Sequence, residues 1–393
     1  MSTRCFDSGM DAPGAAPAQP EMLFSSPWRS IRARGIQAHI DTPALDDAAF
    51  RAAIAQALAH ARAAGQDAPI VMGAIPFDIG APSALFIPAH YEYVSREAVL
   101  AAGHRDALCP RVVSSRNIPE EQDFKMGVRQ AIANFQHSSI RKAVLSRKCE
   151  IRLSEPLDTG CVLGNLVAQN PSAYHFRLPT AEGSELIGAS PELLLRKDGA
   201  RIETFPLAGS ARRQADPAAD QATAAGLQAS AKDHYEHRLV VDDIRQVLSP
   251  LCAQLDIPAG PELVSTATMW HLGTPIVGTL ATPQLPALEL ACRLHPTPAV
   301  CGFPRRLARK LVDLIEPFER GVFTGIVGWC DDQGNGEWVV TIRCATVQKS
   351  LLCLFAGVGI VEASCPDAEW AETQAKLATM LNAFGLEREL SLS

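Results

Sequence analysis

Two helical segments that lie far apart in the chain each carry carboxylates three residues apart. One contains Asp233 and Glu236, and the other contains Glu369 and Glu372, with Lys376 one turn further on. Residues i and i+3 lie on one face of a helix. If the fold brings the two faces together, four carboxylates meet, and they repel one another unless a cation lies between them. The pattern therefore predicts a hard divalent metal, Mg2+, at these residues. The alternative is an ordinary solvated acidic face on each helix.

A lysine in an apolar strand is the second candidate for chemistry. Lys142 lies in the strand pattern of residues 140–153, on the same side as Ile140 and Val144. A lysine that faces the core is costly unless it is paired or deprotonated, and a lowered pKa suits a general base. Lys142 is therefore a candidate base. The alternative is an edge-strand lysine that keeps the strand from aggregating.

A glutamate between two apolar strands is the matching candidate acid. Glu192 follows Pro191, which ends one strand, and precedes Leu193, which begins the next. A carboxyl group flanked by apolar residues tends to have a raised pKa, so that it can donate a proton near neutral pH. The alternative for Glu192 is a turn carboxylate that accepts a hydrogen bond from nearby backbone.

Two further features indicate an anionic ligand. Arg343 lies in the apolar strand pattern of residues 337–347, on one face with Thr341. An arginine in such a strand usually has a fixed anionic partner, either a protein carboxylate or a substrate carboxylate. Gly357 and Gly359 end the next strand and run into a loop before the last helix, where backbone N–H groups can meet an anion. A substrate with carboxylate or phosphate groups fits both features.

The elements that must position these residues come in groups. Short strands are predicted within residues 174–206, 262–280 and 325–357, helices at 123–137, 218–255 and 366–384, and a loop-rich crossing at 101–119. Strands in consecutive groups with helices between the groups predict an α+β fold with antiparallel sheets. We expect a disordered segment at residues 1–20, which are rich in Ala, Pro and Gly, and a single domain over residues 21–393.

Composition narrows the class of protein. The 393 residues are 47% apolar, enough for a substantial core, and the net charge of −7 argues against broad nucleic-acid binding. No run of 18 apolar residues and no secretory start is visible, so neither a membrane span nor export is expected. Eleven cysteines lie scattered without a C-x-x-C pair, which indicates reduced thiols in a cytoplasmic protein and argues against zinc. The dispersed histidines, His234, His237, His271 and His295, are interpreted as hydrogen-bonded structural groups or pocket lining.

Several ordered motifs between residues 120 and 385 resemble the chorismate-utilising enzymes. This family contains isochorismate synthases, salicylate synthases, and the large subunits of anthranilate and aminodeoxychorismate synthases. The motifs are KAVLSR (142–147), GASPE (188–192), LAGS (207–210), KDHYEH (232–237), HPTPA (295–299), GIVGW (325–329), TIR (341–343), GVGIV (357–361) and EWAETQAK (369–376). Each motif is short, but the set in this order is specific. The resemblance is closest to siderophore-pathway isochorismate synthases, and FSSPWRS at residues 24–30 also looks like their start.

The resemblance implies an acid–base mechanism on chorismate. Lys142 matches the base that activates water for addition at C2 of the ring, and Glu192 matches the acid that protonates the departing C4 hydroxyl. The residues that match groups holding the substrate are Gly209, Ser210, Ala299, Val300, Ile342, Arg343, Gly357, Gly359 and Lys376. The implied fold is one α+β domain in which large antiparallel sheets are surrounded by helices, with the site in a cleft.

The resemblance also implies a Mg2+ site. Glu236 and Glu372 match ligands of an ion that holds the ring carboxylate, and Asp233 and Glu369 match outer carboxylates of the same site. Asp233 departs from the glutamate that is more usual at its position.

The subfamily depends on a few residues. Members that use ammonia look different at Lys142, and the chain contains no Gly-x-Cys-x-Gly nucleophile motif, so no glutaminase subunit is expected. One type of aminodeoxychorismate synthase carries a lysine in Pro-Ile-Lys-Gly-Thr, where this chain reads PIVGT at 275–279. Salicylate synthases tend to carry threonine at the position of Ala299, and here Ala299 is followed by Val300.

These differences favour an isochorismate synthase. We expect a monomeric, cytoplasmic, Mg2+-dependent enzyme that supplies siderophore biosynthesis. The alternatives are a salicylate synthase, which goes on to eliminate pyruvate, and a non-catalytic chorismate-binding protein.

Overall fold

Antiparallel strand pairing builds the frame of the molecule. The computed structural model describes residues 21–45, 47–104 and 108–386. Seventeen strands form one sheet: β1 (Met22–Ser25), β2 (Ser30–Ile40), β3 (Ile70–Ile75), β4 (Ala84–Val94), β5 (Val112–Ile118), β6 (Lys142–Leu153), β7 (Tyr174–Pro179), β8 (Glu185–Ser190), β9 (Leu193–Asp198), β10 (Arg201–Phe205), β12 (Cys252–Asp256), β15 (Ile276–Leu280), β16 (Gly302–Phe303), β17 (Ile326–Asp331), β18 (Gly336–Val340), β19 (Cys344–Gln348) and β20 (Leu351–Ile360). Three more form a small sheet: β11 (Leu207–Arg212), β13 (Glu262–Ser265) and β14 (Met269–Gly273).

The large sheet joins strands from both ends of the chain. Its neighbours run in the order β5, β6, β20, β19, β8, β7, β1, β2, β4, β3, β17, β18, β9, β10, β15 and β12, with β16 paired to β6. All of these pairs are antiparallel, so the predicted α+β class with large antiparallel sheets is confirmed.

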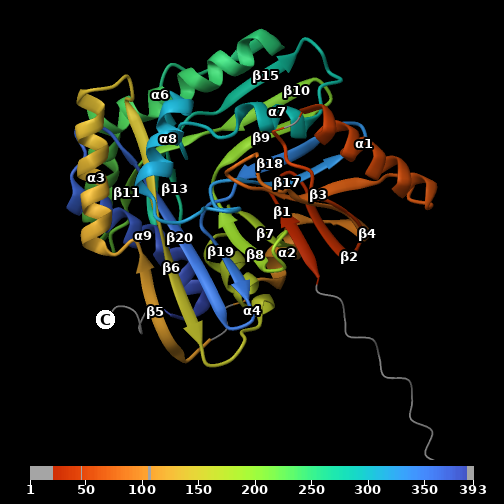
Figure 1. Ribbon diagram of the computed structural model, residues 1–393, viewed down its shortest axis with the longest axis horizontal. Coiled ribbons are helices and arrows are strands. Elements are labelled where there is room, and N and C mark those ends of the chain that lie inside the picture. Colours follow the sequence, from red (N-terminus) through yellow and green to blue (C-terminus); the bar gives the residue numbers. More distant parts are fainter. Residues whose placement is uncertain (1–20, 46, 105–107, 387–393) are drawn as a thin grey trace, which may run out of the picture.

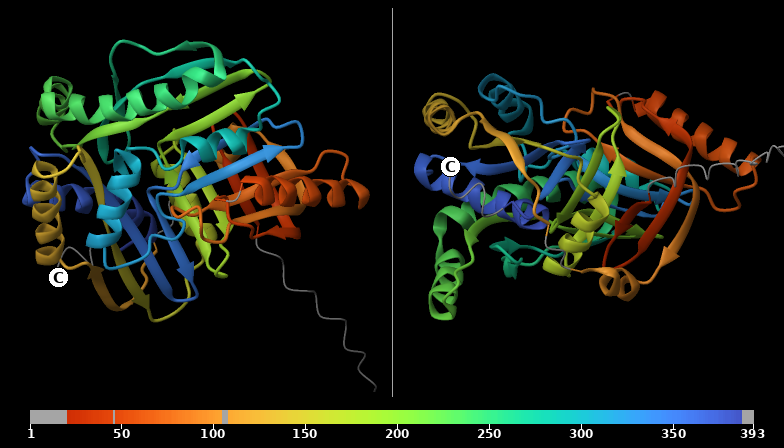
Figure 2. Two further views of the ribbon diagram at one scale, coloured as in Figure 1. Left: turned by 45° about the horizontal axis from the view of Figure 1, so that its top comes forward. Right: turned by 90° about the horizontal axis from the view of Figure 1, so that it is seen from below.

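Helices surround the sheets. The described residues form α1 (Asp47–Ala63), α2 (Arg96–Ala102), α3 (Glu121–Gln136), α4 (Thr159–Gln169), α5 (Pro217–Ala229), α6 (Ala231–Leu248), the 3-10 turn η1 (Ser249–Leu251), α7 (Ala287–Leu294), α8 (Arg305–Ile315) and α9 (Pro366–Phe384). Figure 1 shows α3 and α9 beside β6 and β20 at one side of the molecule, and α1 at the opposite side with β3 and β4. In the left view of Figure 2, α6 (green) lies along the upper edge, above the strands.

Local signals explain why the two carboxylate-bearing helices form. Ser230 caps α6, because its hydroxyl accepts a hydrogen bond from the Asp233 N–H at 3.2 Å. Pro366 opens α9, with acidic side chains in the first turn, and Gly385 ends it in the left-handed conformation at φ 71°. Both helices were predicted, and α9 has the bounds expected from the sequence.

Three predictions about elements were wrong. Residues 252–255 were placed in a helix, but they belong to β12, which pairs with β15 after Pro250 has ended the helical run. Residues 112–118 were placed in a loop, but they form β5, a largely exposed strand beside β6 that lacks apolar alternation. The strand predicted at 337–347 is interrupted at 341–343, and Arg343 has a φ of 49° there.

The glycine pair near the C-terminus lies at the end of a strand, as predicted, but the strand is longer than expected. It runs to Ile360, so that both Gly357 and Gly359 belong to β20 and pair with Ser146 and Val144 of β6. The predicted disordered segment at 1–20 lies outside the described residues. Within the described parts of the chain, no helix is long and apolar enough to cross a membrane.

Candidate active site

The predicted site residues gather around one cavity. Twelve of the fifteen predicted residues line it: Glu192, Gly209, Ser210, Glu236, Ala299, Val300, Ile342, Arg343, Gly357, Gly359, Glu372 and Lys376. The other three, Lys142, Asp233 and Glu369, lie outside the lining.

Lys142 lies directly behind the cavity wall. Its side chain is fully buried, and its Nζ lies 2.9 Å from Oε1 of Glu236, which does line the cavity. Strand β6 has neighbours on both sides at this point, β16 and β20, so the edge-strand alternative for Lys142 is wrong. Burial raises the pKa of Glu236, but the ammonium groups of Lys142, Lys376 and Lys232 outweigh burial and hold that pKa below its usual range.

A glycine in β20 makes room for this ion pair. A Cβ at Gly359 would lie 2.8 Å from Cδ of Glu236 and 2.9 Å from Cε of Lys142, with Oε1 of Glu236 nearer still. Contacts this short do not occur without movement of one group, so position 359 must lack a side chain if Lys142 and Glu236 are to meet.

Replacement of Gly359 by alanine is expected to separate Lys142 from Glu236. We expect a loss of about 10²-fold in kcat/KM, the effect of displacing catalytic groups by ~1 Å, and a loss of ~1–3 kcal/mol in unfolding free energy from overpacking. Steady-state kinetics and urea unfolding measure the two effects. Gly226→Ala is the matched control, because a Cβ there meets nothing within 4 Å and α5 gains helix propensity. Near-normal kinetics for Gly359→Ala would show that this contact is not needed.

Glu192 has the environment of a general acid. It is 3% exposed, and burial raises its pKa to about 7, with the Leu207 N–H and the charges of Lys142 and Arg343 acting in the opposite direction. The raised pKa was predicted. Its Oε1 accepts a hydrogen bond from the Leu207 N–H at 3.5 Å, so the carboxylate is bonded to backbone on β11 and not to its own turn.

Backbone contacts hold Arg343 next to Glu192. The Val340 N–H donates to the Glu192 carbonyl at 3.1 Å, and the Ala189 N–H donates to the Arg343 carbonyl at 3.0 Å. The Arg343 side chain is buried, and burial lowers the pKa of its guanidinium to about 10. Among the described residues it has no ion-pair partner. The sequence left open whether Arg343 pairs with a protein carboxylate or with a substrate carboxylate, and no protein carboxylate pairs with it in the described ranges.

The uncovered edge of β20 provides backbone donors. Strand β19 pairs with β20 only as far as Leu354, so the next residues have β6 on one side alone. Lys376 Nζ donates to the Gly357 carbonyl at 2.9 Å, which places that carbonyl on the free edge. The N–H of a strand residue points to the same edge as its C=O, and residue i+2 repeats the direction. The N–H groups of Gly357 and Gly359 therefore face the side of the cavity.

The two carboxylate-bearing helices meet, as predicted, but the carboxylates pair with lysines. Lys232 of α6 contacts Glu369 of α9 at 2.9 Å, and Lys376 contacts Glu372 at 2.6 Å. Glu236 and Glu369 are buried, so the solvated-face alternative is wrong for them. Within the described ranges, no three His, Cys, Asp or Glu side chains stand close enough together to hold one ion, and the Mg2+ site at these four carboxylates stays a prediction.

The electrostatics of the same residues nevertheless suit a dication. Burial raises the pKa of Glu369, and the charge of Glu372 raises it further. Burial also raises the pKa of Asp233, and Glu236 and Glu372 add to that rise. All four groups offer oxygen donors, the ligands that Mg2+ prefers, and a cation would relieve their mutual repulsion.

Gly209, which lines the cavity, packs against Asp233. Gly209 has a φ of 80° at an irregularity in the pairing of β11, and a Cβ there would lie 3.0 Å from Cβ of Asp233. Only glycine adopts this conformation readily.

Several lining residues were not predicted as site residues. His271 Nδ1 lies 3.0 Å from the Ser210 hydroxyl, and burial lowers its pKa well below the usual range, so the ring is neutral. Phe323 and Phe355 stack with ring centroids 5.0 Å apart. The unpredicted lining residues are Val144, Pro191, Leu207, Ala208, His271, Phe323, Thr324, Phe355 and Ala356. The motifs around 188–192 and 207–210 contain three of them, but no periodicity marks the aromatic pair.

Comparison with known proteins identifies the relatives of this chain. Residues 91–385 match the family described as Chorismate binding enzyme. The chain is 46% identical over 375 residues to the isochorismate synthase EntC of Escherichia coli, covering 94% of this chain and 96% of that protein. It is 42% identical over 386 residues to the isochorismate synthase DhbC of Bacillus subtilis, covering 94% and 95%. A crystal structure from Bacillus anthracis, provisionally described as a 2,3-dihydroxybenzoate-specific isochorismate synthase, superposes with a TM-score of 0.86 at 39% identity, covering 93% and 96%.

Proposed function

The chain belongs to the family of chorismate binding enzymes, and from this premise we propose that it is a Mg2+-dependent isochorismate synthase. The observation that carries the proposal is that a buried acid and a buried arginine without an ion-pair partner among the described residues line the same cavity. Glu192 has a pKa raised to about 7, and the Arg343 guanidinium has no ion-pair partner among the described residues. Glu192 can donate a proton in this cavity, and the guanidinium of Arg343 can bind an anion. A cavity with these two groups suits an anionic substrate that loses a hydroxyl group.

The reaction converts chorismate to its isomer isochorismate, so the atomic composition does not change. Water adds at C2, and Lys142 takes its proton. The ring double bonds shift, and the C4–O bond breaks. The leaving hydroxide takes the proton of Glu192 and departs as water. Acid and base exchange protons with solvent before the next turnover.

Binding of the substrate is assigned to the cations and amides of the cavity. Arg343, Lys376 and the N–H groups of Gly357 and Gly359 hold its carboxylates. Glu236 and Glu372 are the proposed Mg2+ ligands, with Asp233 and Glu369 as outer carboxylates. The bound ion supplies positive charge for the ring carboxylate. The similarity to the 2,3-dihydroxybenzoate-specific relative supports a supply of isochorismate for an aromatic siderophore.

Product analysis with and without a chelator tests the proposal. The purified chain incubated with chorismate and Mg2+ is expected to form isochorismate, separated from chorismate by liquid chromatography. EDTA is expected to abolish turnover, because the carboxylates then lack the charge that holds the substrate, and excess Mg2+ is expected to restore it. Undiminished turnover in EDTA would contradict the metal requirement.

The same assay separates the rival functions. Stoichiometric release of salicylate and pyruvate would identify a salicylate synthase, and Mg2+-dependent binding of chorismate without turnover would identify a binding protein. The cytoplasmic location, the monomeric state and the lack of a glutaminase subunit stay predictions. Light scattering on the purified chain measures the oligomeric state.

A further inference from the structure

Strand β6 has a gap in its pairing close to Lys142. On one side of β6, β16 pairs with Lys142 and Ala143, and β5 begins only at Lys148. Between them, the Val144 carbonyl and the Ser146 N–H face no strand. Arg320 Nη2 donates to the Val144 carbonyl at 2.7 Å, and Glu316 Oε1 accepts from the Ser146 N–H at 2.6 Å. The side chains of Glu316 and Arg320 therefore take the place of a neighbouring strand.

The Glu316–Arg320 pair is buried and fully bonded. Arg320 Nε contacts Glu316 Oε2 at 2.8 Å, and Nη2 contacts Oε1 at 2.6 Å, so the two groups meet through both oxygens. The two side chains are 4% and 2% exposed. The guanidinium also lies 4.3 Å from the centroid of the Phe77 ring. A bidentate, buried pair of this kind has one preferred geometry.

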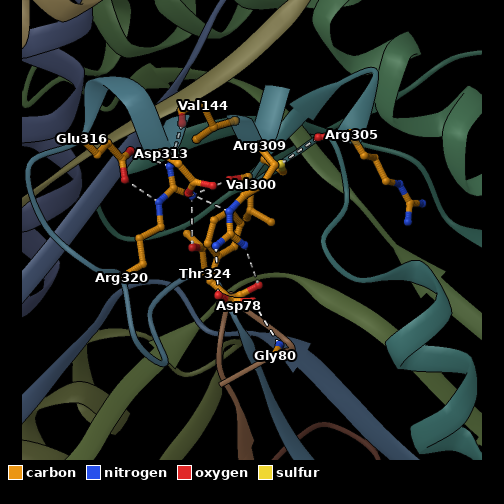
Figure 3. Close-up of polar contacts among 12 residues, drawn as sticks. Asp78, Gly80, Val144, Val300, Arg305, Arg309, Asp313, Glu316, Arg320 and Thr324 are labelled. Atoms are coloured by element: carbon orange, nitrogen blue, oxygen red, sulfur yellow. Dashed lines mark hydrogen bonds and ion pairs between the residues drawn. The ribbon is translucent and has the colours of Figure 1, made fainter. Parts of the chain in front are cut away.

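Arg320 contacts three walls of the substrate cavity at once. Nη1 donates to the Val300 carbonyl at 2.7 Å and to the Thr324 hydroxyl at 3.2 Å, and Nη2 reaches Val144 (Figure 3). Val144, Val300 and Thr324 all line the cavity. They come from β6, from the turn after α7 and from the turn before β17. One planar guanidinium thus sets the spacing of three segments that are distant in the sequence.

We propose that the Glu316–Arg320 pair is a positioning element for the reaction, and this inference rests on the proposed function. Arg320 fixes Val144, two residues from the base Lys142, and Val300, next to Ala299. It touches neither Arg343 nor Lys376 nor the β20 amides. The pair therefore governs how the ring lies against the acid and base, and has little influence on how tightly the substrate carboxylates are held.

The test is the Arg320→Lys variant. Lysine keeps the charge and one contact to Glu316, but it lacks the planar fork that reaches all three walls. We expect kcat to fall by about 10–100-fold with KM within about threefold, since displacement of groups by ~1 Å costs rate more than affinity. We also expect a larger share of turnovers to end in salicylate and pyruvate, because relaxed walls allow the enolpyruvyl group orientations from which isochorismate splits into these two products. Loss of folded protein alone would lower both products equally.

Two variants keep the test interpretable. Arg309→Lys is the matched control. Arg309 also stacks on Phe77, at 4.5 Å, but its described ion pairs and hydrogen bonds are to Asp78, Asp313 and the Phe77 carbonyl, none of which lines the cavity. The kcat of Arg309→Lys should therefore stay within about twofold of wild type (Figure 3). Glu316→Gln retains an acceptor for the Ser146 N–H and is expected to lose less activity than Arg320→Lys.

The outcomes separate this inference from the proposed function. If the wild-type chain does not form isochorismate, the proposed function fails. If the wild-type chain forms it and Arg320→Lys retains its kcat, or loses kcat with an unchanged pyruvate share, the positioning role is wrong. Circular dichroism and thermal unfolding of each variant give the folded fraction by which kcat is normalised.

Discussion

Replacement of Lys142 by alanine is expected to lower kcat/KM for isochorismate formation by about 10²–10⁴-fold, the usual contribution of a positioned base. Nζ of Lys142 lies 2.9 Å from Glu236 at the cavity wall, and the side chain is fully buried. Alanine removes the amine at this position and leaves the Glu236 carboxylate without the cation that contacts it. Loss of one partner of a buried pair costs about 3–5 kcal/mol, so the variant should also unfold at a lower temperature.

A second lysine of the same strand provides the control. Lys148 lies six residues further along β6, is partly exposed and pairs with Glu150 at 2.8 Å. Lys148→Ala should keep kcat/KM near the wild-type value, because an exposed pair contributes ~0–1 kcal/mol and the residue does not reach the cavity. Turnover is measured at a temperature where circular dichroism shows all three proteins folded. A folded Lys142→Ala enzyme with wild-type kcat would remove Lys142 from the mechanism.

The chemistry-bearing residues were predictable because their types are unusual in their surroundings. A lysine in an apolar strand, a glutamate between two strands and carboxylates at i and i+3 each break a local pattern at a known cost. The structure places Lys142, Glu192 and Glu236 within or directly behind one cavity. Helices α6 and α9 were predictable for a related reason, because Ser230 and Pro366 are local start signals.

The lysine partners of Glu236 and Glu369 were not predictable, because they depend on distant contacts, whereas Lys376 lies only four residues from Glu372. Glu369 meets Lys232 across 137 positions of sequence, and Glu236 meets Lys142 across 94. Helical spacing places carboxylates on one face but says nothing of which cations approach from another element. The same limit applies to Arg320, whose three wall contacts involve one strand and two turns. A local window cannot distinguish it from an ordinary surface arginine.

The interruption at residues 341–343 was missed for a different reason. The apolar run on both sides resembles one strand, and only the tertiary contacts show the break. The Thr324 N–H donates to the Thr341 carbonyl at 2.8 Å, and the Thr341 N–H donates to the Gly325 carbonyl at 2.9 Å. Arg343 takes a φ of 49°, a conformation that non-glycine residues seldom adopt. Such local strain concentrates at functional positions, and here it accompanies the residue assigned to the substrate carboxylate.

Replacement of Glu192 by glutamine is expected to lower kcat/KM by about 10²–10³-fold and to change the pH profile. Glutamine keeps the size of the side chain and an acceptor for the Leu207 N–H, but it has no proton to donate. Burial raises the pKa of Glu192 to about 7, so the protonated form needed for catalysis is lost as pH rises through about 7. The wild-type kcat/KM should therefore fall above this pH, and the residual activity of Glu192→Gln should lack that decline.

Glu337 provides the control for this prediction, because its pKa is similar to that of Glu192 but it does not line the cavity. It is fully buried in β18, and burial raises its pKa to about 7 as well. For both groups the pKa in the folded protein exceeds that in the unfolded chain, so each lowers the free energy of unfolding as pH rises from about 4.5 to 7. Above that range, either glutamine variant should therefore gain stability relative to wild type. Only Glu192→Gln should also remove the decline in kcat/KM. If Glu337→Gln removed it equally, the decline would report the stability of the fold, and the assignment of Glu192 as the acid would lose its support.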